Sequence, residues 1–496
     1  MIEKAIAGMA AALAAAALFS GCAVGPDFRR PAPPSVSGYT AGPLAPTPSA
    51  AIAGGEEQRF AAGKDIPRKW WELFRSPELN GLVERSIRNN PTIDAARAAL
   101  RQARENVRAQ RGAYYPSVQA GASALRAKDS NAVAPVPFSG IEPYTLYTGQ
   151  VSVGFSPDIF GGNRRLVESL QAQADFQRFQ LEAAYLALTS NVVAAAIQEA
   201  SLRAQISETQ GIIEIEADML DTLRKQFSLG YAAGLDVAAQ EAALAQVKQT
   251  LPPLEKALAQ NRDLLAALAG SFPSEGPQEK FDLASLSLPQ ELPVSLPSRL
   301  VEQRPDVRAA EEELHSASAE VGVAVAAMLP NITLDANIGS TASGIGDLFT
   351  PGMGLWSLAG GVAQPVFEGG MLLHRKRAAE AGLDQAAAQY RSTVISAFQN
   401  VADTLHALES DAAALKAAAD FEQAAKRSLD LTRRQFELGY VNYLSLLSAE
   451  QAYRQAAINL AQARANRFAD TAALFMALGG GWWNGRDIAL KTGAPK

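Results

Sequence analysis

The sequence contains one pattern twice, half a chain apart, so its fold must be built from two copies of one plan. Four pairs of segments match in the same order and at a nearly constant spacing. Matches of this kind indicate an internal repeat. The pairs are 90–96 with 304–310, 115–118 with 329–332, 157–162 with 365–370, and 226–231 with 435–440.

The repeat predicts how the chain is divided. Proline-rich stretches separate the copies from one another and from the N-terminus, and such stretches are typical of extended linkers. The expected divisions are a signal peptide at 1–21, a lipid-anchored tether at 22–75, a first repeat at 76–272, a linker or equatorial segment at 273–296, a second repeat at 297–478, and a C-terminal tail at 479–496.

Each repeat is predicted to run helix, strand, strand, helix, helix. The first helix is expected over 77–115 in one copy and 297–329 in the other, and Pro116 and Pro330 end these helices.

A much longer helix is expected after the strands of each repeat. Segments 163–227 and 371–436 contain no proline and one glycine each. At 1.5 Å per residue such a helix spans roughly 95–100 Å. Dense alanine lets long neighbouring helices pack closely, as in coiled coils and helical tubes.

The predicted strands alternate apolar and polar residues. In 331–339 every even position is apolar and every odd position is polar or glycine, and in 150–156 the odd positions are apolar and the even ones polar or glycine. Segments 117–124 and 356–362 follow the pattern less strictly. Segments of about ten residues with this period are typical of strands that span a membrane in a β-barrel. We expect Leu334 to face lipid and Asp335 to face the lumen.

Four strands cannot close a barrel, and an open edge in lipid leaves backbone N–H and C=O groups unpaired. Several copies of the chain must therefore share one barrel. Two copies give eight strands with a filled interior, and three give twelve strands with room for a lumen. The lumen favours a trimer.

The N-terminus is interpreted as an export signal and an anchor. Residues 5–19 are apolar but too short for a comfortable membrane span. They end before Ser20, Gly21 and Cys22, which resembles a lipoprotein processing site with Cys22 as the lipidated first residue of the mature chain. A small cysteine buried in an uncleaved anchor is the alternative. By analogy with bacterial lipoproteins, which aspartate at this position would retain in the inner membrane, Ala23 would permit sorting to the outer membrane.

Composition excludes several classes of protein. The formal charge is −6, which gives no reason to expect nucleic-acid binding. Three histidines and one cysteine leave almost nothing for a metal or thiol site. His315, His374 and His406 lack ligand spacing and are interpreted as surface or packing residues. No phosphate-binding or hydrolase motif is present, so the chain is predicted not to be an enzyme and to need no cofactor beyond a covalent lipid on Cys22.

The chain resembles the outer membrane factors of tripartite efflux systems, similar to TolC and closer to the OprM and NodT lipoproteins. The resemblance extends from Cys22 to about Trp482. The motifs that carry it are 22–31 (CAVGPDFRRP), Trp70-Trp71 with Phe74 and Leu79, 296–307 (LPSRLVEQRPDV) continuing through Gly322 to Pro330, and 477–482 (ALGGGW).

This resemblance implies a mainly helical protein with a membrane barrel. Three chains would form a twelve-stranded β-barrel, four strands per chain, continued by a long α-helical barrel. The implied function is a passive conduit across the periplasm for small molecules such as drugs. A proton-driven inner-membrane pump would deliver them through a periplasmic adaptor protein. The protein would lie in the bacterial outer membrane, lipid-anchored, extending into the periplasm.

The resemblance also implies that the turns after the two long helices form the periplasmic tip that docks the adaptor and gates the pore. These turns are Leu229-Gly230-Tyr231 and Leu438-Gly439-Tyr440. Glycine at a turn supplies a positive φ, so ordinary helix caps are the alternative. Asp236 follows the first turn. Ser445 and Ser448 stand in the second where the family commonly has acidic residues, which puts an acidic constriction in doubt.

Two other functions stay open at this point. One is an outlet for type I protein secretion, which the lipid anchor disfavours. The other is a lipid-anchored helical scaffold without a pore.

Overall fold

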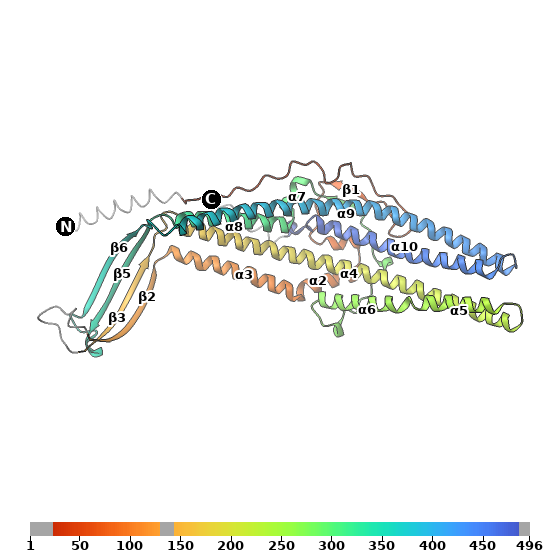
Figure 1. The fold of residues 1–496 in the computed structure, drawn as a ribbon, viewed down its shortest axis with the longest axis horizontal. Helices are drawn as coiled ribbons and strands as arrows, with labels where there is room; N and C mark the ends of the chain where they lie inside the picture. The colour runs from red at the N-terminus through yellow and green to blue at the C-terminus, as the bar shows by residue number, and fades with distance from the viewer. Residues whose placement is uncertain (1–22, 129–142, 486–496) are drawn as a thin grey trace. The chain divides into compact units, whose positions relative to one another are not determined.

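The computed structural model describes residues 23–128 and 143–485. They belong to two compact units, which Figure 1 draws in one colour gradient along the chain. The strand unit comprises Met1–Arg30, Ala99–Gln177 and Ala310–Tyr390, and the helical unit comprises Pro31–Ala98, Arg178–Ala309 and Arg391–Lys496. Four helices begin in one unit and end in the other.

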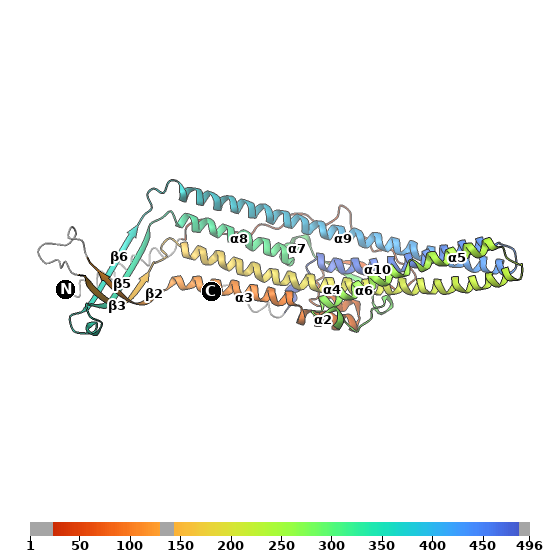
Figure 2. The same cartoon turned by 60° about the horizontal axis from the view of Figure 1, so that its bottom comes forward.

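A four-stranded antiparallel sheet dominates the strand unit (Figures 1 and 2). Its strands lie in the order β2 (Ser117–Ala127), β3 (Tyr144–Phe155), β5 (Asn331–Ala342) and β6 (Gly354–Ala363). The central strands β3 and β5 come from the two different halves of the chain. The four strands predicted from the alternating pattern are therefore confirmed.

The short first helix of each half is broken, which corrects the single helices expected over 77–115 and 297–329. The first half has α2 (Pro77–Asn89) and α3 (Pro91–Arg111), and the second has α7 (Pro297–Gln303) and α8 (Pro305–Ala326). Asn90 and Arg304 between them are extended, with ψ of 121° and 123°. The helical region is disfavoured for a residue before proline, and proline itself is well suited to begin the next helix.

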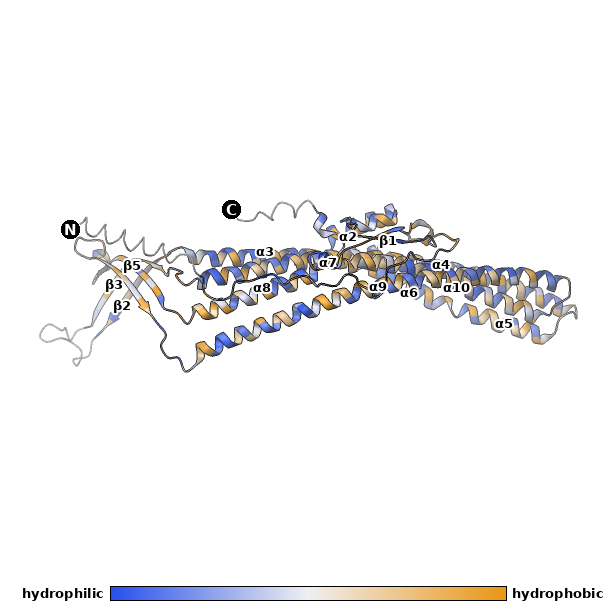
Figure 3. Cartoon of the chain, turned by 90° about the horizontal axis from the view of Figure 1, so that it is seen from above, coloured by the Kyte–Doolittle hydropathy of each residue, from blue (hydrophilic) through white to orange (hydrophobic). Residues whose placement is uncertain are grey.

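The two long helices are present as predicted. Helices α4 (Gly162–Ser228) and α9 (Met371–Glu437) each contain 67 residues. Figure 3 shows polar and apolar turns mixed along both of them. An 18-residue stretch of α4 reaches a mean hydropathy of 1.2, so by length and composition it could cross a membrane, but 44% of that stretch is buried, as in core helices of soluble proteins.

The helices that follow differ between the halves. After α4 come α5 (Gly234–Lys248) and α6 (Leu251–Leu268), whereas α9 is followed by the continuous α10 (Tyr443–Ala477). Pro252 and Pro253 lie in the first turn of α6, where proline is tolerated because the first backbone N–H groups of a helix have no internal partner.

The helical unit also contains a small parallel sheet that the sequence did not predict. Strand β1 (Arg59–Ala62) pairs with β4 (Glu291–Val294), which lies far along the chain. Gln58, next to β1, is fully buried, and its side-chain amide donates to Pro289 O and Thr471 Oγ1, both at 3.0 Å. Segments expected to be a tether and a linker therefore pack onto α10.

Aromatic side chains fill the core beside this sheet. Trp70 in the short helix η1 (Trp70–Phe74) stacks on Phe475 with ring centroids 5.4 Å apart, and Phe74 lies 6.3 Å from Phe468. Trp70, Phe74, Phe468 and Phe475 are all essentially inaccessible to solvent. Large aromatic rings dominate the burial energy of such a core.

Candidate functional site

One face of the four-stranded sheet is apolar and exposed. The register places β-branched, leucine and aromatic side chains in rows across the strands, for example Val151 opposite Ile338 and Ile338 opposite Trp356. Trp356, Leu358 and Val362 on β6 are more than 70% exposed. In water such a patch would promote aggregation, whereas in a bilayer it would contact the hydrocarbon chains favourably.

The opposite face of the same sheet is polar. One row across all four strands consists of Gln119, Ser152, Asn337 and Ser357. Asp335 pairs with Gly154 and Ala359 on this face, while its neighbour Leu334 pairs with Phe155 on the apolar one. Leu334 and Asp335 thus lie on the apolar and the polar face respectively, as the alternation predicts.

The edges of this sheet are unpaired within the described residues. Strands β2 and β6 each have one neighbour, β3 and β5 respectively. Strand β2 has 11 residues and β6 has 10. Edges of this length with an apolar face are templates for pairing with another chain.

The two turns at the ends of the long helices have the same backbone geometry. After α4, Tyr231 N donates to Gln226 O at 2.9 Å and Gly230 N donates to Phe227 O at 3.0 Å. The equivalent bonds after α9, from Tyr440 N to Gln435 O and from Gly439 N to Phe436 O, are both 2.9 Å. These are the two bonds of a Schellman cap.

Glycine is required at the centre of each cap. Gly230 has φ of 80° and Gly439 has φ of 76°. A Cβ added at either position would meet nothing within 4 Å. The glycines are therefore explained by backbone conformation, and the open space beside them leaves room for a partner.

The side chains around both caps are exposed and apolar. Leu229 and Tyr231 are 68% and 82% exposed, and Leu438 and Tyr440 are 70% and 79% exposed. Within the helical unit, therefore, the predicted tip residues lie on two turns that present similar side chains to solvent.

The N-termini of the two helices that follow are capped in opposite ways: by a side chain inside the helix in α5, and by the residue before the helix in α10. Asp236 in α5 accepts a hydrogen bond from Ala233 N at 3.3 Å, so the side chain inside the helix caps the backbone before it. In α10 the residue before the helix, Asn442, accepts from both Ser445 N at 3.0 Å and Ser445 Oγ at 2.9 Å. Asp236 and Ser445 occupy the same helical position, which explains how serine replaces the carboxylate there.

The two helical hairpins pack together just behind the turns. Leu223 of α4, Ala243 of α5, and Tyr443 and Leu447 of α10 form one buried cluster, against which Phe436 of α9 packs. The two hairpins, α4–α5 and α9–α10, therefore form one body.

A buried polar chain, absent from the sequence predictions, lies beside this cluster. Gln240 of α5 is fully buried and donates to the backbone and side-chain oxygens of Glu216 on α4, and it accepts from the Tyr443 hydroxyl on α10. Burial raises the pKa of Tyr443, which keeps the phenol protonated as a donor.

The buried polar chain continues through two arginines. Arg454 contacts Glu216 and, at 3.1 Å, Glu450, and Arg433 of α9 reaches Glu450 at 3.2 Å. Burial raises the pKa of Glu450 and lowers that of Arg454 to about 10. No sequence signal marks this polar chain, because Glu450 and Arg454 have the spacing of an ordinary exposed helix pair.

The residues after the predicted lipidation site are held in the strand unit. Cys22 itself lies outside the described residues. Val24 N donates to Phe160 O at 3.1 Å, and Arg165 of α4 donates to Val24 O at 3.0 Å and to Asp27 at 2.6 Å. Gly25 (φ 94°) lies against the backbone of Gly322 on α8.

Residues 23–30, which we call the N-terminal clip, make further contacts. Phe28 stacks on His315 with centroids 4.3 Å apart, and His315 Nε2 is 3.0 Å from Glu168. Arg30 is bonded to Glu311 at 2.6 Å. The clip residues belong to the motif that carried the resemblance, and most of them have a packing role.

Nothing in the described residues indicates a metal centre. No group of three or more His, Cys, Asp or Glu side chains is arranged to hold an ion there. His374 and His406 are exposed on α9, and His315 on α8 packs against Phe28 of the clip.

These features together define a membrane-associated protein with a two-faced sheet and long helical hairpins, and comparison with known proteins gives its family. The chain belongs to the outer membrane efflux protein family, whose model matches residues 82–271 and 296–480. It is an outer-membrane protein that serves in efflux, and proteins of this kind are channels rather than enzymes.

Named relatives cover nearly all of the chain. The toluene efflux pump outer membrane protein TtgC of Pseudomonas putida is 28% identical over 468 residues, which is 94% of each chain. The pyoverdine export outer membrane protein OpmQ of Pseudomonas putida is 28% identical over 436 residues, covering 87% of this chain and 92% of the relative.

Solved structures share the fold. The outer-membrane channel OprN matches with a TM-score of 0.83 and 26% identity, over 93% of this chain and all of that one. The open-state MtrE outer membrane channel of Neisseria gonorrhoeae matches with a TM-score of 0.79 and 25% identity, over 93% and 98% of the two chains.

Proposed function

We propose that three copies of this chain form one channel that carries small molecules out of the cell. The observation that carries the proposal is the two-faced sheet with unpaired edges. Joining β6 of one copy to β2 of the next would pair both edges, turn the apolar faces toward lipid and line a lumen with the polar faces.

Three copies suit this arrangement better than two. Twelve strands enclose a water-filled lumen, whereas the interior of an eight-stranded barrel is filled by side chains. The polar row with Gln119, Ser152, Asn337 and Ser357 favours a hydrated interior.

The long helices would continue the conduit through the periplasm. A helix of 67 residues rises roughly 100 Å along its path, and α4 and α9 connect the strands to the tip turns. The channel supplies no energy of its own in this proposal. A proton-driven inner-membrane pump would deliver cargo through a periplasmic adaptor. Names of relatives that mention toluene and pyoverdine support small-molecule cargo.

The adaptor would dock on the tip turns. Leu229, Tyr231, Leu438 and Tyr440 are apolar and exposed, and the two turns have the same geometry. Valine at Gly439 would disfavour the positive φ and place a side chain at the contact.

The test compares Gly439→Val with Gly352→Val. Gly352 lies in the β5–β6 loop with φ of 98° and open space around it, so the backbone strain is matched away from the tip. Ethidium accumulation is measured in cells whose only outer-membrane efflux channel is this protein, and is divided by the amount of folded trimer. We expect Gly439→Val alone to lose efflux per trimer and adaptor crosslinking at Tyr440. Normal efflux per trimer in Gly439→Val would show that the turns are only caps.

We also propose that Cys22 carries lipid. The clip places Ala23 against Gly161, shortly after the last residue of β3, so acyl chains on the preceding cysteine would start near the end of a membrane strand. Several acyl chains hold a protein on a membrane durably. Metabolic labelling with palmitate should mark the wild type and leave Cys22→Ser unlabelled. Label on Cys22→Ser would refute the assignment.

A further inference from the structure

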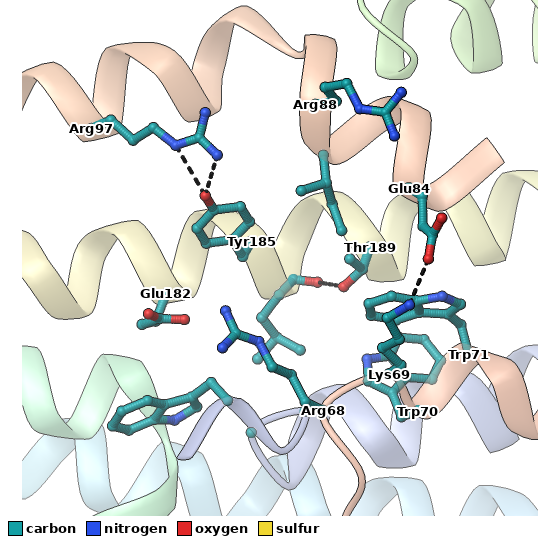
Figure 4. A pocket seen from close by; sticks show the side chains of 15 residues that line it. Arg68, Lys69, Trp70, Trp71, Glu84, Arg88, Arg97, Glu182, Tyr185 and Thr189 are labelled. Carbon is teal, nitrogen blue, oxygen red and sulfur yellow. Dashed lines mark hydrogen bonds and ion pairs between the residues drawn. The ribbon is translucent and has the colours of Figure 1, made fainter. Parts of the chain in front are cut away.

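Two sequence motifs from opposite ends of the chain meet at a crevice in the helical unit. Trp70-Trp71 and Gly479-Gly480 with Trp482 lie on one side, and α2, α3 and α4 form the other. The crevice encloses about 470 Å³, and Figure 4 shows the side chains that line it. That volume is within the roughly 300–1,000 Å³ of small-molecule sites.

Indole rings and aliphatic groups form much of the crevice wall. Trp71 and Trp482 contribute aromatic surface, and Leu186 contributes aliphatic surface from α4. Gly480 has φ of 65°, and a Cβ there would clash with Leu186 Cδ1. The glycine therefore lets the C-terminal turn approach α4 closely, which shapes the crevice.

Hydrogen-bond donors without partners gather around this wall. Arg68 and Arg88 make no hydrogen bond or ion pair within the described part of the chain. The Tyr185 hydroxyl accepts from Arg97 Nε at 3.1 Å and from a terminal Arg97 nitrogen at 2.6 Å, so its own hydrogen is left to donate. Trp71 is 5% exposed, and its buried Nε1–H has no partner among the described residues.

Fewer hydrogen-bond acceptors than donors line the crevice. The crevice is lined by four cationic side chains and by two carboxylates, Glu84 and Glu182. Glu84 is held by Lys69 at 2.6 Å, and this contact lowers the pKa of Glu84. The local surplus of positive charge and of N–H and O–H donors contrasts with the formal charge of −6 on the whole chain.

We propose that this crevice binds a small organic anion with an aromatic body. Its carboxylate would lie between the Arg68 guanidinium and the Tyr185 hydroxyl, from which it would accept hydrogen bonds, the one from arginine being charge-assisted. Its ring would lie against Trp71 and Trp482, because aromatic rings stack edge-to-face or offset with a further gain beyond burial. The proposal is independent of conduction, since the crevice lies wholly among residues of the helical unit.

In the experiment, assembled protein in lipid nanodiscs is titrated with 2-naphthoate, and binding is measured by calorimetry and by tryptophan fluorescence. We expect saturable binding that is about tenfold tighter than that of the uncharged 2-naphthalenemethanol, a difference of about 1.4 kcal/mol. The variant Arg68→Gln should lose at least about tenfold in affinity. Arg108→Gln is the control, because Arg108 pairs with Glu105 on α3 outside the crevice.

A second variant tests the buried indole. Trp71→Phe keeps a ring in place but removes part of the indole surface against which the naphthyl ring would lie, so affinity for 2-naphthoate should fall by a few-fold. The melting temperature of every variant reports whether it is folded.

The proposal is overturned if the folded Arg68→Gln variant binds as the wild type does, if the uncharged analogue binds equally well, or if no saturable binding is seen. Binding to separated protomers but not to the assembly would also overturn it, because a neighbouring copy would then fill the crevice.

Discussion

The two halves of the chain end their long helices alike and then diverge. Helices α4 and α9 have 67 residues each and finish in the same Schellman cap. Beyond the cap, the first half returns in two helices broken before Pro252, whereas the second returns in the single α10 of 35 residues. The shared pattern therefore determines helix length and cap, while local residues determine how the chain returns.

A second difference lies at the corner between strand and long helix. Ile159 and Phe160 in the first half are half-buried, whereas Val366 and Phe367 at the matching corner are 91% and 87% exposed. The clip accounts for this, because Val24 bonds to Phe160 and the chain has only one N-terminus. Because the clip occurs only once in the chain, it covers one corner and leaves the matching corner exposed.

The largest effect is expected in the sheet, to which the two halves of the chain contribute similar strands. Leu334→Arg places a charge on the apolar face, which costs about 2–4 kcal/mol per chain at the bilayer midplane. Val151→Arg, on the same face but in the first half, should be as damaging, whereas Asp335→Arg should assemble. Heat-resistant oligomers on gels, at matched expression, measure assembly. Equal assembly of Leu334→Arg and Asp335→Arg would show that the register is wrong.

The next effect tests the corner that the clip covers. A Cβ at Gly322 would lie 2.7 Å from Arg165 Cγ and 2.9 Å from Val24 O, so Gly322→Ala should loosen the clip at a cost of about 1–3 kcal/mol. Gly382→Ala, on α9 with open space around it, should stabilise by about 0.5–1 kcal/mol. Limited proteolysis of residues 23–30 and thermal unfolding report both. A change of the same sign in the free energy of unfolding of the two variants would contradict the packing assigned to Gly322.

A smaller effect tests the reversed capping. Asp236→Ala and Asn442→Ala each remove the accepting side chain and should cost about 1 kcal/mol of helix stability. Ser445→Ala, at the position that matches Asp236, should cost less, because Asn442 still accepts from the Ser445 backbone. Amide exchange in the first turns of α5 and α10 measures each loss. Equal losses for Ser445→Ala and Asp236→Ala would mean that the roles are not reversed.

The smallest effect is a pH dependence of the clip. Hydrogen bonding to Glu312, with Glu168 adding to it, raises the pKa of His315 above its ordinary value. A raised pKa means that the folded clip favours the protonated ring, so this stability is fully present below the ordinary pKa and is lost as the pH rises through the raised one. Residues 23–30 should resist proteolysis a few-fold better at about pH 6 than at about pH 8.5. His315→Asn should remove the difference, and its persistence there would exclude His315 as the cause.

Regular patterns in the sequence predicted the regular parts of the fold. Alternation identified all four strands and the faces of Leu334 and Asp335, and the lack of proline identified α4 and α9 to within a residue or two. The helix pattern does not predict the breaks at Asn90 and Arg304, because it continues across Pro91 and Pro305; the proline after each residue drives it toward extended backbone.

Other features had no local signal. Strands β1 and β4 have four residues each, and β4 contains Pro293. Neither is long enough to show alternation, and they pair across a large part of the chain. The buried polar chain from Tyr443 to Arg433 joins four helices, and only tertiary packing turns Glu216, Glu450 and Arg454 away from water. Such contacts depend on which helix faces meet, which the pattern of a single helix does not determine.

The central claim is that the polar face of the sheet lines a pore shared by several copies. The direct test is the reversal potential of purified protein in planar bilayers under a salt gradient, for the wild type and Asp335→Arg. We predict discrete channels from both, with the variant shifted toward anions, because each copy replaces a lumen carboxylate by a guanidinium. An unchanged reversal potential in conducting Asp335→Arg channels, or no conductance from inserted wild-type protein, would contradict the account.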